Sequence, residues 1–295
     1  MDTADLKVFE AVQRIGNMSR AAAELNMVQS NVTARIRQLE ERLGVELFDR
    51  HSRGVTPTPA GRRLLPYARG MLALLNDARR AVTDDGAPKG PLSIGSLETT
   101  AAMHLSPMLS TYVAAWPEVD LALRTGTTCE LIDGVLERRL DGAFVCGPVN
   151  HPDLDERTIF HEELVVLTAP GVERLDWRSG VADLKIVVLR AGCSYRQRLE
   201  EVLARRGVVG LRRLEFGTLE AIYGCVAAGL GVTLLPRRMA EAVWRDGRAA
   251  IHTLTPDEAM VDTVFIRRRD GHFSSALSAF LAQVDASAAR AVAAE

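Results

Sequence analysis

The segment from Ser19 to Arg50 limits the fold of this chain more than any other. Within it, apolar residues recur at the i, i+4, i+7, i+11 spacing of one helix face, at Val32, Ile36, Leu39 and Leu43. Such a stripe has to pack against the rest of a domain. Because a helix turns by about 100° per residue, the stripe also fixes which side chains face outward. The segment therefore predicts a helix with one buried face and one polar face.

The predicted outer face carries polar and cationic side chains. It centres on Ser30, Ala34 and Arg37, and it is flanked by Gln29, Asn31, Thr33, Arg35 and Gln38. Gln and Asn can form two hydrogen bonds with an adenine edge, Arg can do the same with guanine, and Ser or Thr hydroxyls reach bases or phosphates. This chemistry suits the major groove of DNA. A small helical bundle also has polar outer faces, so the face alone leaves both interpretations open.

The neighbouring segments favour the DNA interpretation. Upstream, the spacing of Leu6, Phe9 and Val12 predicts a first helix, and Ser19 stands where a second helix would start. Asn26 and Met27 are expected to form the turn before the polar helix. Downstream, a basic stretch with a glycine and two prolines, DRHSRGVTPTPAG, cannot continue a helix and is expected to form a wing.

This order of elements resembles the winged helix-turn-helix of LysR-type transcriptional regulators. The similarity rests on FEAVQRIGNMSRAAAELNMVQSNVTARIRQLEERLGVELFDR, followed by Val55, Thr58, Pro59, Ala60 and Gly61. Members of this family are about as long as this chain. Two positions depart from the family pattern: Ser30 stands where many members have Pro, and Ala34 stands where many have Arg. Arg35 or Arg37 is expected to compensate for the missing arginine.

The resemblance implies which residues bind promoter DNA: Gln29, Ser30, Asn31, Thr33, Arg35, Arg37, Arg50 and Arg53. The last two belong to the wing, where they would contact the DNA backbone or reach the minor groove. The alternative for the wing is a solvated basic loop without a DNA contact.

The chain is expected to divide into three parts. Residues 1–58 would form the winged helix-turn-helix domain, residues 59–89 a long linker helix, and residues 90–295 an effector-binding domain. The linker helix has more apolar surface than a lone linker needs, so it would pack against its own domain or against a second copy. In the family it forms an antiparallel dimer arm, which implies a homodimer or homotetramer.

Composition and charge are compatible with this division. At 47% hydrophobic and 25% charged residues, the chain has the composition of an ordinary globular protein. The net charge is −2, yet the part up to Arg63 has ten Lys and Arg against eight Asp and Glu, while the remainder is negative. No apolar run is long enough to span a bilayer, and the first residues lack a signal-peptide pattern. We therefore expect a cytoplasmic protein with no membrane partner.

The remainder of the chain alternates strand-like and helix-like segments, which predicts an α/β domain with a parallel sheet. Expected strands cover residues 92–97, 120–125, 142–146, 164–169, 185–190 and 232–236, and expected helices cover residues 99–116, 129–140, 194–207 and 218–231. The patterns GLGVTLLP, LSIG and LDGAF resemble the family's regulatory domain, which has a two-lobed, periplasmic-binding-protein-like fold. That resemblance implies one lobe at about 90–162 and 266–295, and a second at about 163–265.

In such a fold, a ligand lies where the carboxyl ends of strands meet helix N-termini. The candidate effector-binding residues are the hydroxyls, the thiol and the tyrosine at four helix starts: Ser96, Thr99, Thr100, Thr127, Thr128, Cys193, Ser194, Tyr195 and Thr218. Together with free backbone N–H groups they would bind an anion such as a carboxylate. Helix capping is the alternative at each position. Cys146 stands where some aromatic-acid sensors of the family have Arg, so Arg124 or Arg196 would have to supply a cation.

Other chemistries have weak support. Four cysteines, Cys129, Cys146, Cys193 and Cys225, are widely spaced and show no metal-binding pattern, so we expect no metal and no cofactor. Nucleotide-binding and nucleophile motifs are missing, which argues against an enzyme. Two other functions stay open: a redox-sensing regulator that uses a cysteine, and a small-molecule-binding protein that does not bind DNA. An enzyme of unknown type that uses a cysteine is a further alternative.

The sequence therefore predicts a LysR-type, DNA-binding transcriptional regulator. Its partners would be double-stranded promoter DNA, a small and anionic effector, other copies of itself and, as a further candidate, RNA polymerase. The effector can change transcription only if it prefers one arrangement of the lobes or subunits over another.

Overall fold

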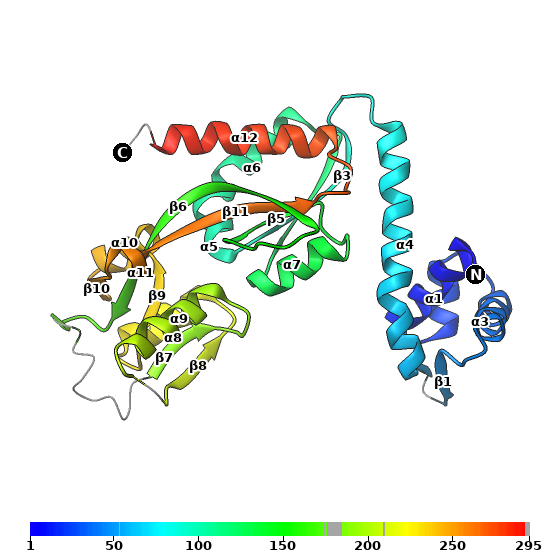
Figure 1. The fold of residues 1–295 in the computed structure, drawn as a ribbon, viewed down its shortest axis with the longest axis horizontal. Coiled ribbons are helices and arrows are strands. Elements are labelled where there is room, and N and C mark those ends of the chain that lie inside the picture. The colour runs from blue at the N-terminus through cyan, green and yellow to red at the C-terminus, as the bar shows by residue number, and fades with distance from the viewer. Residues whose placement is uncertain (53, 174, 176–184, 209, 293–295) are drawn as a thin grey trace. The chain divides into compact units, whose positions relative to one another are not determined.

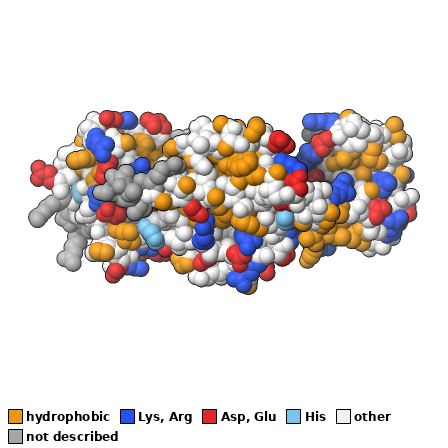
Figure 2. Space-filling view, turned by 90° about the horizontal axis from the view of Figure 1, so that it is seen from above, with side chains coloured by type: hydrophobic (Ala, Val, Ile, Leu, Met, Phe, Trp, Pro, Cys, Tyr) orange, Lys and Arg blue, Asp and Glu red, His pale blue; other side chains and the backbone are white. Residues whose placement is uncertain are grey.

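The computed structural model describes residues 1–52, 54–173, 175, 185–208 and 210–292. These residues form two compact units, which are described separately: residues 1–85 with 137–139, and residues 86–136 with 140–295. Acidic and basic side chains are interspersed on the face that Figure 2 shows. No described helix is long and apolar enough to cross a membrane.

The first unit has the predicted winged helix-turn-helix architecture (Figure 1). Its elements are α1 (Thr3–Ile15), α2 (Met18–Glu24), α3 (Gln29–Leu43), β1 (Phe48–His51), β2 (Gly54–Pro57) and α4 (Pro59–Thr83). Asn26 adopts a left-handed conformation (φ 52°) in the turn between α2 and α3, as its short polar side chain allows. Strands β1 and β2 pair in antiparallel register and form the wing.

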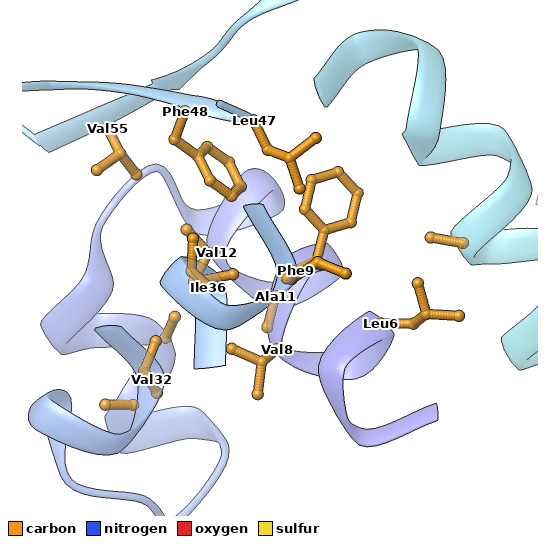
Figure 3. Packing of buried hydrophobic residues seen from close by; sticks show 14 residues of the cluster. Leu6, Val8, Phe9, Ala11, Val12, Val32, Ile36, Leu47, Phe48 and Val55 are labelled. Carbon is orange, nitrogen blue, oxygen red and sulfur yellow. The ribbon is translucent and has the colours of Figure 1, made fainter. Parts of the chain in front are cut away.

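A single apolar core holds this unit together. Val32, Ile36 and Leu39 of α3 are fully buried, so the predicted stripe is confirmed at these positions. Figure 3 shows the side chains of α1, α3 and the wing pointing toward one another, with Phe9 of α1 close to Phe48 of β1. The prediction for Leu43 was wrong, because this residue is 41% exposed at the last position of α3, beyond the packed part of the helix.

The turn of the wing lies against the end of α1. The backbone N–H of Val55 donates to the carbonyl of Gly16 over 3.0 Å. Gly54 has φ +138°, and a Cβ atom there would lie 2.4 Å from the Gly16 carbonyl oxygen. Only glycine fits this approach without moving the backbone.

The second unit is a two-lobed α/β domain, which confirms the predicted fold class. Lobe one contains β3 (Gly90–Ser96), α5 (Glu98–Thr100), the π-helix η1 (Ala101–Leu105), α6 (Ser106–Ala115), β4 (Val119–Thr125), α7 (Thr128–Leu136), β5 (Gly142–Cys146) and α12 (Ser275–Val292). Lobe two contains β7 (Lys185–Leu189), α8 (Ser194–Arg205), β8 (Arg212–Phe216), α9 (Leu219–Ala227), β9 (Thr233–Pro236), α10 (Arg237–Arg245), β10 (Ala250–Thr253) and α11 (Pro256–Ala259). Each lobe has its own buried apolar clusters.

Two long strands connect the lobes: β6 (Leu154–Thr168) and β11 (Met260–Arg268) run side by side in antiparallel pairing (Figure 1). Residues 154–163 of β6 pair with β11, whereas residues 164–168 pair with β9 and β10 in lobe two. The register between β6 and β11 shifts once, between Thr263 and Val264. The lobes therefore share continuous hydrogen-bonded strands and not a flexible linker.

The expectation of a parallel sheet was correct only in part. The pairs β3–β4, β3–β5 and β7–β8 are parallel, but every pair that involves β6 or β11 is antiparallel. The sequence pattern predicts a strand only on the apolar second half of β6, and it does not predict β8, β10 or α10. Most residues in the first half of β6 are charged or polar, namely DERT, His161 and Glu162, so its periodicity does not stand out.

Candidate functional site

The outer face of α3 is accessible to a partner. Gln29, Ser30, Asn31 and Arg37 are exposed, and Thr33 is half-buried. Arg37 forms no hydrogen bond or ion pair with any residue that the structure describes. Its guanidinium group therefore keeps its donors available for a base or a phosphate.

Gln29 is already oriented by a contact within the motif. The Ser19 hydroxyl of α2 donates to Gln29 Oε1 over 2.8 Å. This bond occupies the carbonyl oxygen of the Gln29 amide and leaves its NH₂ group free to donate. It also links α2 to the first turn of α3.

Arg35 has a structural contact that the sequence analysis did not anticipate. Its Nη1 donates to Asp5 Oδ1 over 3.0 Å, and Arg42 Nη1 donates to Asp5 Oδ2 over 3.0 Å. Asp5 is only 2% exposed, and it also caps α1 through its hydrogen bond with the N–H of Asp2. Two arginines of α3 thus neutralise a buried carboxylate of α1 and fix the angle at which α3 crosses α1. Arg35 is consequently less available for DNA than Arg37.

Glu40 connects α3 to the wing, and the sequence analysis missed it. Its Oε1 accepts hydrogen bonds from the backbone N–H groups of Leu47 and Phe48 over 2.9 and 3.2 Å, and its Oε2 accepts one from Arg50 over 3.1 Å. The side chain is 12% exposed. The sequence does contain a signal for this role, because Glu40 directly follows Leu39 of the buried stripe, and a charged side chain rarely lies at such a position without hydrogen-bonding partners. Arg53, predicted in the wing, lies outside the described residues.

A narrow cleft lies between the two lobes. Its lining comes from the ends of β3, β4 and β7 and from the first turns of α5 and α8, and it consists of Leu97, Glu98, Thr99, Thr125, Gly126, Thr127, Leu189, Arg190, Cys193, Ser194, Tyr195 and Gly217. The cleft encloses about 40 Å³, enough for a few water molecules. A larger ligand therefore requires the lobes to move apart.

Five of the nine predicted effector residues line this cleft: Thr99, Thr127, Cys193, Ser194 and Tyr195. Thr99 is 2% exposed, and its hydroxyl interacts with the Tyr195 hydroxyl, which also lines the cleft. The Ser194 hydroxyl donates to the Thr128 hydroxyl over 2.7 Å, which joins the start of α8 to the start of α7 across the cleft.

The other predicted residues do not line the cleft. Ser96 is fully buried, and its hydroxyl donates to the Leu97 carbonyl. Thr100 is also buried, while Thr218 caps α9 by accepting from the N–H of Ala221. At Thr218 the structure therefore supplies the capping alternative.

The charged groups of the cleft differ from those expected. Arg196 forms ion pairs with Glu200 and Glu215, and Arg124 is exposed on β4; neither lines the cleft. Arg190, at the end of β7, and Glu98, in the first turn of α5, do line it. Arg190 is the last residue of the predicted strand 185–190, and this place at a strand's carboxyl end was the available signal, but Arg190 was not among the predicted cations.

A buried polar network spans the lobes beside the cleft. The Tyr195 hydroxyl of α8 donates to Glu162 Oε2 over 3.1 Å, and His104 Nε2 of η1 lies 3.2 Å from Glu162 Oε1. Burial, followed by the charge of Glu162, raises the pKa of Tyr195 well above its ordinary value. The His104 ring stacks on Phe160 with centroids 3.8 Å apart. This network joins lobe two to lobe one through strand β6.

The thiols of Cys146 and Cys193 are not activated. All four are free, and burial raises the pKa of Cys146 to about 11 and the pKa of Cys193 above its ordinary value. Few thiolates form at neutral pH under these conditions. In the part of the chain that the structure describes, no group of three or more His, Cys, Asp or Glu side chains could hold a metal ion.

Two protein families match this chain. The family described as "Bacterial regulatory helix-turn-helix protein, lysR family" matches residues 3–62, and the one described as "LysR substrate binding domain" matches residues 85–289. Together they cover most of the chain.

Individual relatives match over nearly the full length. The chain is 45% identical to the transcriptional regulator GltR of Bacillus subtilis, over 94% of this chain and 93% of GltR. Among solved structures, a full-length variant of OxyR from Pseudomonas aeruginosa has a TM-score of 0.68 at 20% identity and covers 98% of this chain and 94% of its own. Full-length CbnR complexed with its target DNA has a TM-score of 0.67 at 23% identity, with 97% and 100% covered. These two structures support the fold.

Proposed function

Because this chain belongs to the LysR family of DNA-binding, effector-controlled transcriptional regulators, we propose that α3 and the wing read promoter DNA while the cleft between the lobes senses the effector. Residues 1–58 are the proposed DNA-binding domain, residues 59–89 the dimerising linker, and residues 90–295 the sensing domain. One observation supports the DNA-binding role most strongly: the outer face of α3 presents exposed polar side chains around Arg37, which has no partner within the described chain.

We propose that two copies associate through α4. One face of this helix packs on the core of the first unit through Leu64, Leu65, Ala68 and Leu72. A second set of apolar side chains stays exposed, namely Tyr67, Met71, Leu74 and Val82. A dimer would cover this stripe and bring two recognition helices to neighbouring half-sites of DNA. We extend this proposal to a homodimer or homotetramer, with RNA polymerase as the partner for the activating case.

We further propose that the protein acts in the cytoplasm by binding alone and not by catalysis. The effector would occupy the cleft at Thr99, Thr127, Cys193, Ser194 and Tyr195, with the buried Ser96, Thr100 and Thr128 supporting the walls and Thr218 next to Gly217 of the lining. Because the cleft is formed by both lobes, a bound ligand favours one lobe arrangement over another, and this preference is what couples binding to DNA. The raised pKa of Cys146 and Cys193 disfavours the redox alternative.

Footprinting of the full chain tests the DNA-binding role. The probe is the DNA just upstream of its own coding sequence, at near-physiological salt, and the expected result is protection of an imperfect inverted repeat. Arg37→Ala is expected to weaken specific binding by about 1 to 3 kcal/mol, whereas Arg238→Ala, an exposed arginine of α10 in the sensing domain, serves as the matched control. Weak, salt-sensitive and sequence-independent binding would instead favour a small-molecule-binding protein.

A further inference from the structure

The cleft between the lobes contains one cationic and one anionic side chain from opposite walls. Arg190 comes from the end of β7 in lobe two, and Glu98 comes from the start of α5 in lobe one. Neither side chain forms a hydrogen bond or an ion pair with another residue that the structure describes. A narrow cleft that holds two unpaired, opposite charges is suited to a ligand that carries both.

Neither side chain forms an ion pair with a described residue, but the charge of each acts on a neighbouring group. Glu130 is the carboxylate that experiences the charge of Arg190, but its pKa is lowered mainly by the Thr127 backbone, and the charge of Arg190 contributes less. Glu130 Oε2 already accepts from the N–H and the hydroxyl of Thr127 over 2.9 and 3.1 Å. On the opposite wall, Glu98 faces Tyr223 of α9, whose pKa rises to about 12 through burial first and then through the charges of Glu220 and Glu98.

The rest of the lining adds a buried hydroxyl. The Thr99 hydroxyl, next to Glu98 in the chain, is buried near the Tyr195 hydroxyl, and a hydroxyl can donate one hydrogen bond and accept two, so it can also bond a ligand. Leu97 and Leu189 supply apolar surface between the polar groups. The cleft thus offers donors, an acceptor carboxylate and an apolar wall within a small volume.

We propose that the effector of this protein is an α-amino acid, whose carboxylate binds Arg190 and whose ammonium group binds Glu98, with the Thr99 hydroxyl as a further partner. This inference rests on the proposed sensing role of the cleft. Because the two charged partners belong to different lobes, only a ligand with both charges bridges the lobes and stabilises the arrangement in which both contacts form. A simple carboxylate would leave Glu98 unpaired and would experience its repulsion.

Calorimetric titration of the full-length chain tests this inference. The probes are the twenty common L-amino acids at millimolar concentrations, and each amino acid that binds is compared with its deaminated carboxylate and its decarboxylated amine. For leucine, these are 4-methylpentanoate and 3-methylbutylamine. We expect at least one amino acid to bind and both of its analogues to bind more weakly by about tenfold or more, which corresponds to the loss of one charge-assisted hydrogen bond. If the deaminated carboxylate binds as tightly as the amino acid, or if no amino acid binds, the proposal is overturned.

Two variants test which charged group of the ligand Glu98 and Arg190 each bind. Glu98→Gln should remove the preference for the amino acid over its deaminated carboxylate, and Arg190→Gln should remove the preference over its decarboxylated amine. Glu220→Gln and Arg238→Gln change exposed residues outside the cleft, and both should leave these preferences unchanged. Unchanged preferences in Glu98→Gln and Arg190→Gln would also overturn the proposal.

Footprinting distinguishes a failure of the amino-acid proposal from a failure of the DNA-binding proposal. All four variants retain the winged helix-turn-helix domain, so promoter protection without effector should be the same as in the parent chain. A chain that protects its promoter but binds no amino acid disproves only the ligand class, whereas a chain that binds an amino acid without protecting DNA disproves only the DNA-binding proposal.

Discussion

Replacing Glu40 by Ala should loosen the wing without unfolding the rest of the protein. The Glu40 carboxylate is the acceptor for the backbone N–H groups of Leu47 and Phe48, and both of these residues are almost fully buried. An alanine removes the acceptor and leaves two buried N–H groups without a partner. The Arg50 guanidinium loses its ion pair as well, but that pair is more exposed and contributes little.

The magnitude follows from the two backbone hydrogen bonds. A hydrogen bond to a charged acceptor contributes about 1.5 to 3 kcal/mol, so the loss of two such bonds costs about 3 kcal/mol at the lower end of that range. The cost falls on the local opening of the α3–β1 connection. Since about 1.4 kcal/mol corresponds to a factor of ten, the amide hydrogens of Leu47 and Phe48 should exchange roughly 100-fold faster.

Hydrogen exchange of the full chain, followed by mass spectrometry on peptides that span the α3–β1 connection, measures this effect. Glu41→Ala is the matched control, because Glu41 is the next residue of the same helix and is exposed. Exchange in the peptides of the second unit should not change in either variant. An acceleration of less than about threefold in Glu40→Ala would show that other contacts hold the wing, and the reasoning would be refuted.

Three further outcomes are expected. Iodoacetamide should label Cys146 far more slowly than the exposed Cys129 at neutral pH, and the rate at Cys146 should rise about tenfold per pH unit toward pH 11, as thiol mass spectrometry would reveal. Arg206 donates to both carboxylate oxygens of Glu258 over 2.8 and 2.6 Å and lowers the pKa of this carboxyl. The contribution of this ion pair to stability is therefore complete above the pKa of the unfolded Glu258 carboxyl and is lost as the pH falls through the lower, folded value. Urea unfolding of Arg206→Gln and of the parent should differ by about 1 to 3 kcal/mol at pH 7, and this difference should shrink as the pH falls below about 4.3, the ordinary pKa of a Glu carboxyl. Tyr112→Phe removes a buried 2.8 Å hydrogen bond from the Tyr112 hydroxyl to a carbonyl of α12, so calorimetry should detect a destabilisation of about 1 to 3 kcal/mol; an unchanged melting temperature would contradict this role.

The recognition helix could be predicted well because its periodicity reports directly on burial. Val32, Ile36 and Leu39 are fully buried, and the residues predicted to face outward are exposed or half-buried. The partners of the charged side chains could not be predicted in the same way. The contact between Arg35 and Asp5 joins residues thirty positions apart, and helical spacing within α3 contains no information about α1.

The residues that line the cleft could also be predicted only in part, because the lining depends on contacts between distant segments. Helix starts can be located from Ser and Thr in the sequence, yet Thr99 and Thr127 line the cleft while Thr218 caps α9 without lining it. Only the packing of the lobes determines which of these residues line the cleft. Arg190 was missed because apolar runs define strands, and the residue that ends such a run looks the same in a sequence whether it is solvated or faces a ligand.

The two shared strands also determine how the segments that form the two lobes follow one another along the chain. The chain leaves lobe one along β6 and returns along β11, and Glu163 pairs with Met260 on the neighbouring strand. Paired residues of an antiparallel ladder lie only about 5 Å apart, so lobe two begins and ends at almost the same point. Lobe two is therefore a topological insertion into a strand pair of lobe one. An exchange of residues 164–259 for the corresponding piece of a relative would replace half of the cleft and leave the connectivity of lobe one intact.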